Sequence, residues 1–169
     1  MIVIRGYNWN MNKFGLATIL EKVPVGYEFY ENNIPLHLTH IDSFQIDLDA
    51  ENLELKLRRH LIGQKVISTT IKGLANYGPN KDISVVEIDL NDNLKSFHSN
   101  LLTFLEAEGA VFKRPQFLGK NFKPHITETS QIKLFKNEIV NIVEISIAYK
   151  EPIDIKPITK ILSTIAFTS

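Results

Sequence analysis

"IPLHLTHIDSF", residues 34–44, places His37 and Thr39 two positions apart in an otherwise apolar run. Leu36 and Leu38 alternate with them, which is the period-two pattern of a β-strand. Because residues i and i+2 of a strand point to the same side, the imidazole and the hydroxyl share one face. One such pair alone is most simply a polar pair at the edge of a sheet. The interpretation therefore depends on whether the chain holds a second copy.

The second copy lies in "NFKPHITETS", residues 121–130, where His125 and Thr127 repeat the spacing. Residue frequencies predict roughly 0.3 such triplets by chance in a chain of this composition. A proline comes shortly before each histidine, at Pro35 and Pro124. The histidines are 125 − 37 = 88 residues apart in a chain of 169, so each motif occupies a similar place in its half.

The two motifs together indicate a catalytic site. If the half-chains pack about a pseudo-twofold axis, the side chains of His37, Thr39, His125 and Thr127 meet in one cleft. Two imidazoles across one site form a general acid and a general base that work near neutral pH. The hydroxyls beside them are suited to phosphate oxygens. The sequence therefore predicts a site that cleaves or forms a phosphodiester without a metal.

The remaining pattern predicts an α+β fold. Helices are expected at 49–63, with Asp49 as N-cap and leucines every four residues, and at 91–109, with Asn91 as N-cap and Gly109 at the end. Strands are expected at 2–4, 65–74, 83–90, 141–150 and 159–167, and a short helix at 16–22. Helices placed irregularly between pairs of strands favour α+β over a wound parallel sheet.

Composition narrows the class of protein. The 19 basic and 19 acidic residues give a net charge of zero, which argues against a protein that coats long nucleic acids. The absence of cysteine excludes disulfides, thiol nucleophiles and thiolate metal sites. No apolar run approaches the ~20 residues of a membrane span. We expect a cytoplasmic monomer with no metal or other cofactor.

"PLHLTH" and "KPHITE" resemble the two motifs of the 2H phosphoesterases, which include 2′-5′ RNA ligase-like proteins and 2′,3′-cyclic nucleotide phosphodiesterases. The resemblance implies that His37 and His125 are the catalytic pair, and that Thr39 and Thr127 bind the substrate phosphate. By analogy with the ligase-like members, His37 donates the proton and His125 accepts it. The family usually places an apolar residue after each threonine, whereas this chain has His40 and Glu128, both on the opposite strand face.

The resemblance also implies an architecture and a substrate class. We expect residues 1–169 to form one bilobal domain, with two pseudo-twofold-related antiparallel sheets, helices packed outside and a central cleft. The expected activity is a metal-independent phosphodiesterase acting on RNA ends or small nucleotides, through 2′,3′-cyclic phosphate hydrolysis, 2′-5′ cleavage or ligation. The alternatives are a non-catalytic nucleotide- or RNA-binding module with the same cleft, and a scaffold in which the motifs are coincidental.

The segment before the second motif, residues 109–127, contains basic residues and no Asp or Glu. Its simplest interpretation is a solvated loop. The alternative is a surface that attracts nucleotide phosphates and stacks a base on Phe117 or Phe122. The expected substrate contacts are then Arg114, Lys120, Phe122 and Lys123. Of the other histidines, we expect His40 at the surface or behind the site, and His60 and His98 on the solvated sides of helices.

Overall fold

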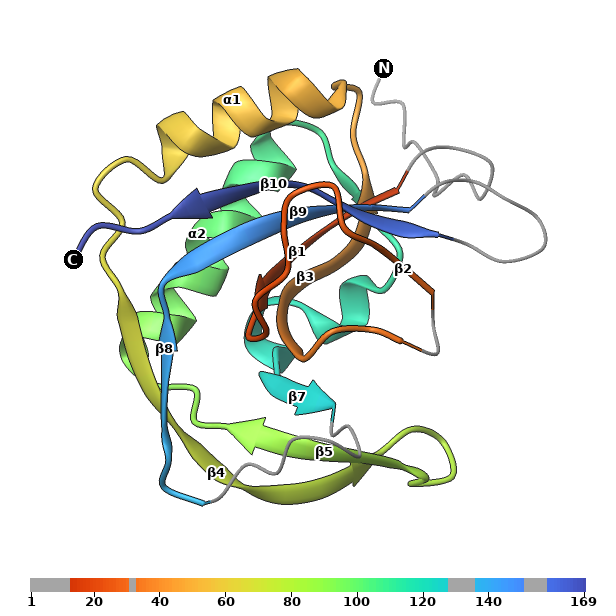
Figure 1. Cartoon of the computed structure of the whole chain (residues 1–169), viewed down its shortest axis with the longest axis vertical. Helices are drawn as coiled ribbons and strands as arrows, with labels where there is room; N and C mark the ends of the chain where they lie inside the picture. The colour runs from red at the N-terminus through yellow and green to blue at the C-terminus, as the bar shows by residue number, and fades with distance from the viewer. Residues whose placement is uncertain (1–12, 31–32, 128–135, 151–157) are drawn as a thin grey trace.

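The computed structural model describes residues 13–30, 33–127, 136–150 and 158–169 (Figure 1). The elements in chain order are β1 (Lys13–Ile19), β2 (Glu28–Phe29), β3 (His37–Gln45), α1 (Ala50–His60), β4 (Ile67–Tyr77), β5 (Ile83–Ile88), α2 (Asp92–Ala107), β6 (Val111–Phe112), the 3₁₀ turns η1 (Pro115–Phe117) and η2 (Gly119–Asn121), β7 (His125–Thr127), β8 (Ile139–Ile142), β9 (Glu144–Lys150) and β10 (Thr159–Ala166). The predicted α+β class is confirmed.

Both long helices begin at their predicted N-caps, and they end at His60 and Ala107, shortly before the predicted ends at residues 63 and 109. The Asp49 carboxylate accepts the backbone N–H of Asn52 at the start of α1, at 2.8 Å. The Asn91 side chain accepts the N–H of Leu94 at the start of α2, at 3.0 Å. These bonds satisfy N–H groups that have no partner inside a helix. After α2 the chain turns at Gly109, whose φ of 81° is a conformation that residues with a Cβ rarely adopt.

The strands form one hydrogen-bonded path in the order β2-β10-β9-β1-β3-β7-β5-β4-β8, and β6 pairs with β3. The pairings between these named strands are antiparallel. Where we expected two sheets, the strands of the two halves are therefore joined edge to edge through β3 and β7. Figure 1 shows β7, β5 and β4 curving away from β3, and β8 leading back toward β9.

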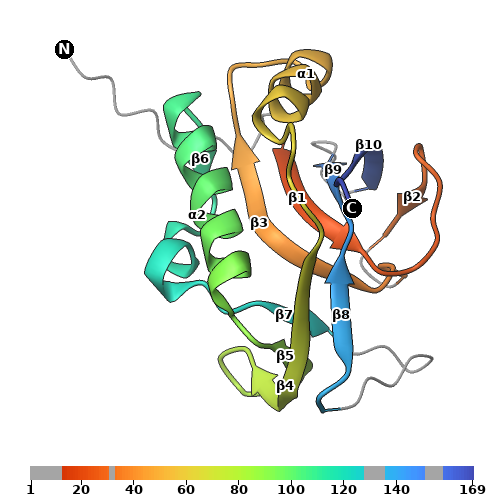
Figure 2. The ribbon, with the colours of Figure 1, turned by 90° about the vertical axis from the view of Figure 1, so that its left-hand side faces the viewer.

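One apolar core fills the space between this sheet and the helices. Helix α2 contacts β3, β4 and η2, while α1 contacts β10, and Figure 2 shows α2 alongside the sheet with α1 above it. The core includes Leu38 of β3, Ile126 of β7 and Leu101 of α2, all fully buried. Each such side chain contributes about 1.5–3 kcal/mol to folding. The core face of β3 is thus the face of Leu38, and the motif residues lie on the other.

Two elements were predicted near the N-terminus, a strand at 2–4 and a short helix at 16–22. The short helix expected at 16–22 is wrong, because Lys13–Ile19 is strand β1 at the centre of the sheet. Its partners on both sides, β3 and β9, supply backbone bonds that override a local helical pattern. The strand expected at 2–4 lies outside the described residues.

Candidate active site

The two His-x-Thr motifs lie on neighbouring strands. Leu38 of β3 is the direct antiparallel partner of Ile126 of β7. Each of these residues stands between the histidine and the threonine of its own motif and points into the core with no exposed surface. The motif side chains therefore point to the opposite face of the sheet. An antiparallel register centred on this pair sets each histidine opposite the threonine of the other motif, so the two histidines occupy one diagonal of a square.

Each motif histidine is held in the same way. The Nδ1–H of His37 donates to the carbonyl of Pro35, and the Nδ1–H of His125 donates to the carbonyl of Lys123, both at 2.8 Å. In both cases the acceptor lies two residues before the histidine. A neutral imidazole with its proton on Nδ1 carries its lone pair on Nε2. The local backbone thus fixes the tautomer, and Nε2 is the atom available for proton transfer.

The environment of His37 disfavours its charged form. Burial lowers the pKa of His37 below its ordinary value of 6.5, although the bond to the Pro35 carbonyl opposes this. The charges of His125 and Lys150 lower the pKa further. The effect of His125 places the two histidines within electrostatic range of each other, as a shared site requires. It also means that a charge on His125 disfavours protonation of His37.

A tyrosine and a glutamate lie beside the second histidine, and the sequence did not single them out. The ring of Tyr77 on β4 meets that of His125 edge-on, with centroids 4.8 Å apart. Its hydroxyl donates to Glu87 Oε1 at 2.8 Å. Glu87 is the cross-strand partner of His125 and so shares its face of the sheet. Burial, together with the bond to Glu87 and its charge, raises the pKa of Tyr77 to about 12, so this phenol remains a donor.

The four residues expected to contact substrate differ in their exposure and in their hydrogen-bond partners. Lys120 and Lys123 are exposed, and Lys123 also supplies the carbonyl that holds His125. Arg114 Nε donates to Asp42 Oδ2 at 2.6 Å. Phe122 is buried, with 8% of its surface exposed, so we assign it no contact with a nucleobase. The other aromatic side chain of the segment, Phe117, is 58% exposed.

The solvated position expected for His98 is wrong, whereas His40 takes the second of its two expected positions, buried behind the site. Each is 1% exposed. His98 donates from Nδ1 to the His40 carbonyl at 3.0 Å and accepts the Gly119 N–H on Nε2 at 3.0 Å. Its ring lies parallel to that of Phe122, with centroids 3.8 Å apart. His98 therefore connects β3, just after the first motif, to the segment that leads into the second. His60 is partly buried and stacks on Phe104.

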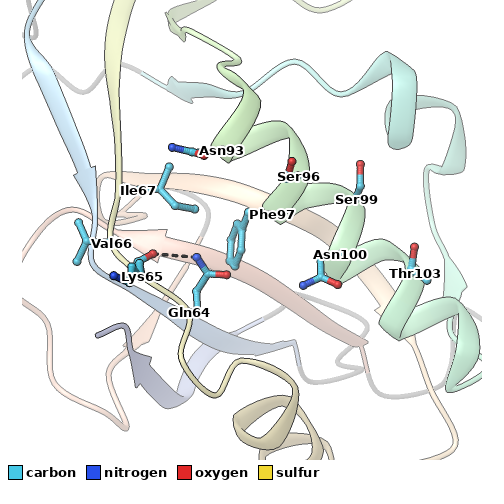
Figure 3. Close-up of a pocket in the computed structure, with 10 residues that line it drawn as sticks. All are labelled: Gln64, Lys65, Val66, Ile67, Asn93, Ser96, Phe97, Ser99, Asn100 and Thr103. Atoms are coloured by element: carbon cyan, nitrogen blue, oxygen red, sulfur yellow. Dashed lines mark hydrogen bonds between the residues drawn. The ribbon is translucent and has the colours of Figure 1, made fainter. Parts of the chain in front are cut away.

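A pocket of about 750 Å³ lies away from the motifs, between α2 and the start of β4 (Figure 3). Its wall includes Phe97, whose ring meets that of His40 at 5.2 Å. His40 points to the core side of β3, so this pocket is on the opposite side of the sheet from His37 and Thr39. Amide, hydroxyl and apolar groups line it, together with Lys65. This lining holds no pair of side chains suited to acid and base catalysis.

The described part of the chain has neither a membrane-spanning helix nor a gathered set of metal ligands. No helix there is long and apolar enough to cross a membrane. Within the same residues, no three or more His, Cys, Asp or Glu side chains are gathered as metal ligands. Glu128, which follows Thr127, lies outside the described residues.

No known family matches the sequence by its family profile, and no curated protein sequence matches it. Solved structures do match. Escherichia coli LigT complexed with 3′-AMP has a TM-score of 0.58 at 15% identity, over 94% of this chain and 99% of LigT. TT0787 of Thermus thermophilus gives 0.58 at 13% identity, over 92% and 97% of the two chains. A structure described as a phosphoesterase gives 0.55 at 15% identity, over 94% and 99%. The chain therefore has the fold of these phosphoesterase and LigT structures, as its resemblance to the 2H phosphoesterases implies.

Proposed function

We propose that this protein is a metal-independent phosphodiesterase that acts on RNA ends or small nucleotides by two-histidine acid–base catalysis. The observation that supports this most strongly is the pairing of Leu38 with Ile126. That single register puts two imidazoles and two hydroxyls on one face from motifs far apart in the sequence. LigT, which shares the fold, has been crystallised with 3′-AMP and with phosphate, and this supports a nucleotide phosphate as the ligand.

The reaction we propose is hydrolysis of a 2′,3′-cyclic phosphate. Nε2 of one neutral histidine accepts a proton from water as the water oxygen bonds to phosphorus. The bond between phosphorus and one ribose oxygen breaks, and Nε2–H of the other, protonated histidine donates to that oxygen. Thr39 and Thr127 donate hydrogen bonds to the non-bridging phosphate oxygens, where negative charge develops. Cleavage or ligation of a 2′-5′ linkage uses the same groups, with a ribose hydroxyl in place of water.

The surroundings of His37 favour it as the proton acceptor in hydrolysis. A base must be neutral before the reaction, and burial together with the charges of His125 and Lys150 lowers the pKa of His37. This reverses the assignment made by analogy, in which His37 was the donor. His125 then supplies the proton to the leaving oxygen.

The expectation of a cytoplasmic monomer stays a prediction.

The test is turnover of 2′,3′-cyclic AMP by His37→Ala and His125→Ala. Each variant should lose about 10²–10⁴-fold in kcat, the usual contribution of a positioned acid or base. His98→Gln is unsuitable as a control because that ring is buried, so the matched control is His60→Gln on α1. A substrate whose leaving group needs no protonation should rescue His125→Ala and not His37→Ala. Rescue of His37→Ala instead would reverse the two roles. Unchanged turnover in both variants would refute the two-histidine mechanism. No turnover by the wild type would favour a binding module.

A further inference from the structure

The second motif histidine stands on a short strand that is only lightly held. β7 has three residues, of which His125 is the first, and its register with β3 is the single pair of Leu38 with Ile126. The bond from His125 Nδ1 to the Lys123 carbonyl is exposed to solvent, whereas the matching bond of His37 is partly buried. Water competes with an exposed hydrogen bond, so this bond holds the imidazole weakly. Keeping its Nε2 in one place requires a second contact.

Tyr77 supplies a second contact to the imidazole. Its ring meets that of His125 edge-on, with centroids 4.8 Å apart and 64° between the ring planes. Edge-to-face packing of this kind is a favoured geometry for aromatic pairs. The Lys123 carbonyl fixes the rotation of the imidazole about its bond to Cβ, because only one orientation aims Nδ1 at that oxygen. The Tyr77 ring occupies space into which the whole imidazole would otherwise swing.

The sequence of β4 allows the tyrosine to lie in this position. Tyr77 ends β4, and Ala75 and Gly73 precede it at period two, on the same face of the strand. Gly73 is the cross-strand partner of Glu87, which is in turn the partner of His125. The β4 side chains between the tyrosine and this row are therefore no larger than a methyl group. Their small size leaves room for the phenol ring to extend along the sheet toward the histidine.

Glu87 anchors the tyrosine at its far end. The Tyr77 hydroxyl donates to Glu87 Oε1 at 2.8 Å. Such a bond to a carboxylate is stronger than one between neutral groups. Burial, the bond to Glu87 and the charge of Glu87 raise the pKa of Tyr77 to about 12, so the phenol keeps its proton over the range in which histidines titrate. The anchor lies on the strand next to that of His125, so the contact joins β4, β5 and β7 on the motif face.

We propose that Tyr77 is a positioning residue for His125. It holds the imidazole so that Nε2 is aimed at the leaving oxygen of the substrate, and Glu87 acts through Tyr77 by anchoring its hydroxyl. Neither Tyr77 nor Glu87 exchanges a proton with the substrate. This inference rests on the proposed function, in which His125 takes part in proton transfer. A displaced imidazole slows the step that uses it and leaves substrate binding little changed.

The first test measures kcat and KM for 2′,3′-cyclic AMP. Tyr77→Leu should lower kcat by about 10–100-fold and change KM by less than about 3-fold, because displacing a reacting group by about 1 Å has effects of this size. Tyr77→Phe keeps the ring and should recover most of the loss. The matched control is Tyr27→Leu, which removes a half-buried tyrosine that stacks on Phe29 of β2, the strand at one end of the sheet, and should leave kcat unchanged. An unchanged kcat in Tyr77→Leu, or a change in KM alone, would overturn the proposal.

The anchoring role of Glu87 is tested by two substitutions at that position. Glu87→Gln should turn over like the wild type, because its amide oxygen still accepts the Tyr77 hydroxyl. Glu87→Leu removes the acceptor and should match Tyr77→Phe, in which the hydroxyl is absent. A loss in Glu87→Gln as large as that in Glu87→Leu would show that the carboxylate acts by its charge, and would overturn the anchoring role.

A double-mutant cycle tests whether Tyr77 acts through His125. With His125 already replaced by alanine, Tyr77→Leu should cost little more, because no imidazole is left to position. A 2′-deoxynucleoside 3′-(4-nitrophenyl phosphate) releases 4-nitrophenolate, which leaves without a proton. On this substrate Tyr77→Leu should follow His125→Ala and not His37→Ala, whichever histidine is the donor. Losses that add in full, or a variant that follows His37→Ala, would overturn the proposal.

A measurement without turnover separates this inference from the proposed function. In ¹H–¹⁵N spectra of the histidine rings, recorded where they are neutral, the wild type should show His125 with its proton on Nδ1, as its bond to Lys123 requires. Tyr77→Leu should lose this single tautomer, whereas Tyr77→Phe and Tyr27→Leu should keep it. Absence of activity on both substrates would reject the proposed function, and the spectra would still decide whether Tyr77 holds the imidazole. An unchanged His125 signal in Tyr77→Leu would refute the positioning role.

Discussion

The buried imidazole of His40 makes the fold sensitive to acid. The Thr18 hydroxyl donates to the Glu144 carbonyl at 2.8 Å, so its oxygen accepts the Nε2–H of His40 at 2.7 Å. Nδ1 of His40 has no hydrogen-bond partner among the described residues. A proton added there would be a buried charge without an acceptor. Burial, with a smaller contribution from His98, accordingly lowers the pKa of His40 from 6.5 to about 3.

The cost of acidification follows from this difference in pKa. The unfolded chain binds the proton below about pH 6.5, whereas the folded chain resists it until about pH 3. His40 therefore leaves the free energy of unfolding unchanged above about pH 6.5, and that free energy decreases as the pH falls from 6.5 toward 3. A pH of about 4.5 lies two units below the pKa of histidine in the unfolded chain. At 1.36 kcal/mol per unit, protonation of the unfolded state lowers the free energy of unfolding by about 2.7 kcal/mol.

The assay is urea unfolding followed by far-UV circular dichroism at pH 7.5 and pH 4.5, for the wild type and His40→Gln. Glutamine keeps a donor near Thr18 and removes the titrating group. Carboxylates and the other histidines contribute to the pH dependence of both proteins alike. Between the two pH values, the free energy of unfolding should therefore fall by about 2.7 kcal/mol more in the wild type than in the variant. His40→Met, which fills the site without titrating, provides a second comparison. Equal losses in wild type and variants would show that this account of His40 is wrong.

Two further outcomes test the roles proposed for the motif residues. Thr39→Ala and Thr127→Ala should each lower kcat/KM for 2′,3′-cyclic AMP by about 10-fold, less than the histidine variants, because each removes a hydrogen bond and not a proton relay; a loss as large as that of His37→Ala would contradict this division. Treatment with a chelator should leave turnover unchanged, because the histidines and hydroxyls already supply proton transfer and charge stabilisation. Activity lost on chelation and restored by a divalent ion would count against the proposed mechanism.

The parts of the fold that could be predicted are those that depend on local chemistry. Asp49 and Asn91 were identified as N-caps because an oxygen side chain before an apolar helical repeat satisfies the first free N–H groups, and both make these bonds. The shared face of His37 and Thr39 follows from the period of a strand. That Leu38 pairs with Ile126 could not be read from the sequence, because a strand pattern fixes which face is apolar but not which strand lies next to it.

The predictions that failed involve residues whose surroundings come from distant parts of the chain. His98 lies on an amphipathic helix, and nothing local showed that Gly119 and the His40 carbonyl would complete its hydrogen bonds. Phe122 was one of two aromatic side chains that the alternative interpretation of the basic segment offered for stacking a base, but it is buried against that same histidine.

The same limit applies to the roles proposed for His37 and His125. The motifs are nearly identical in sequence, and each histidine makes the same bond to a carbonyl two residues earlier. A site that is symmetric in its first contacts cannot distinguish donor from acceptor. The asymmetry enters from the neighbouring strands, since the charge of Lys150 reaches His37, whereas the Tyr77 ring lies against His125. A cation near one histidine favours its neutral form, which supports the proposed role of His37 as proton acceptor.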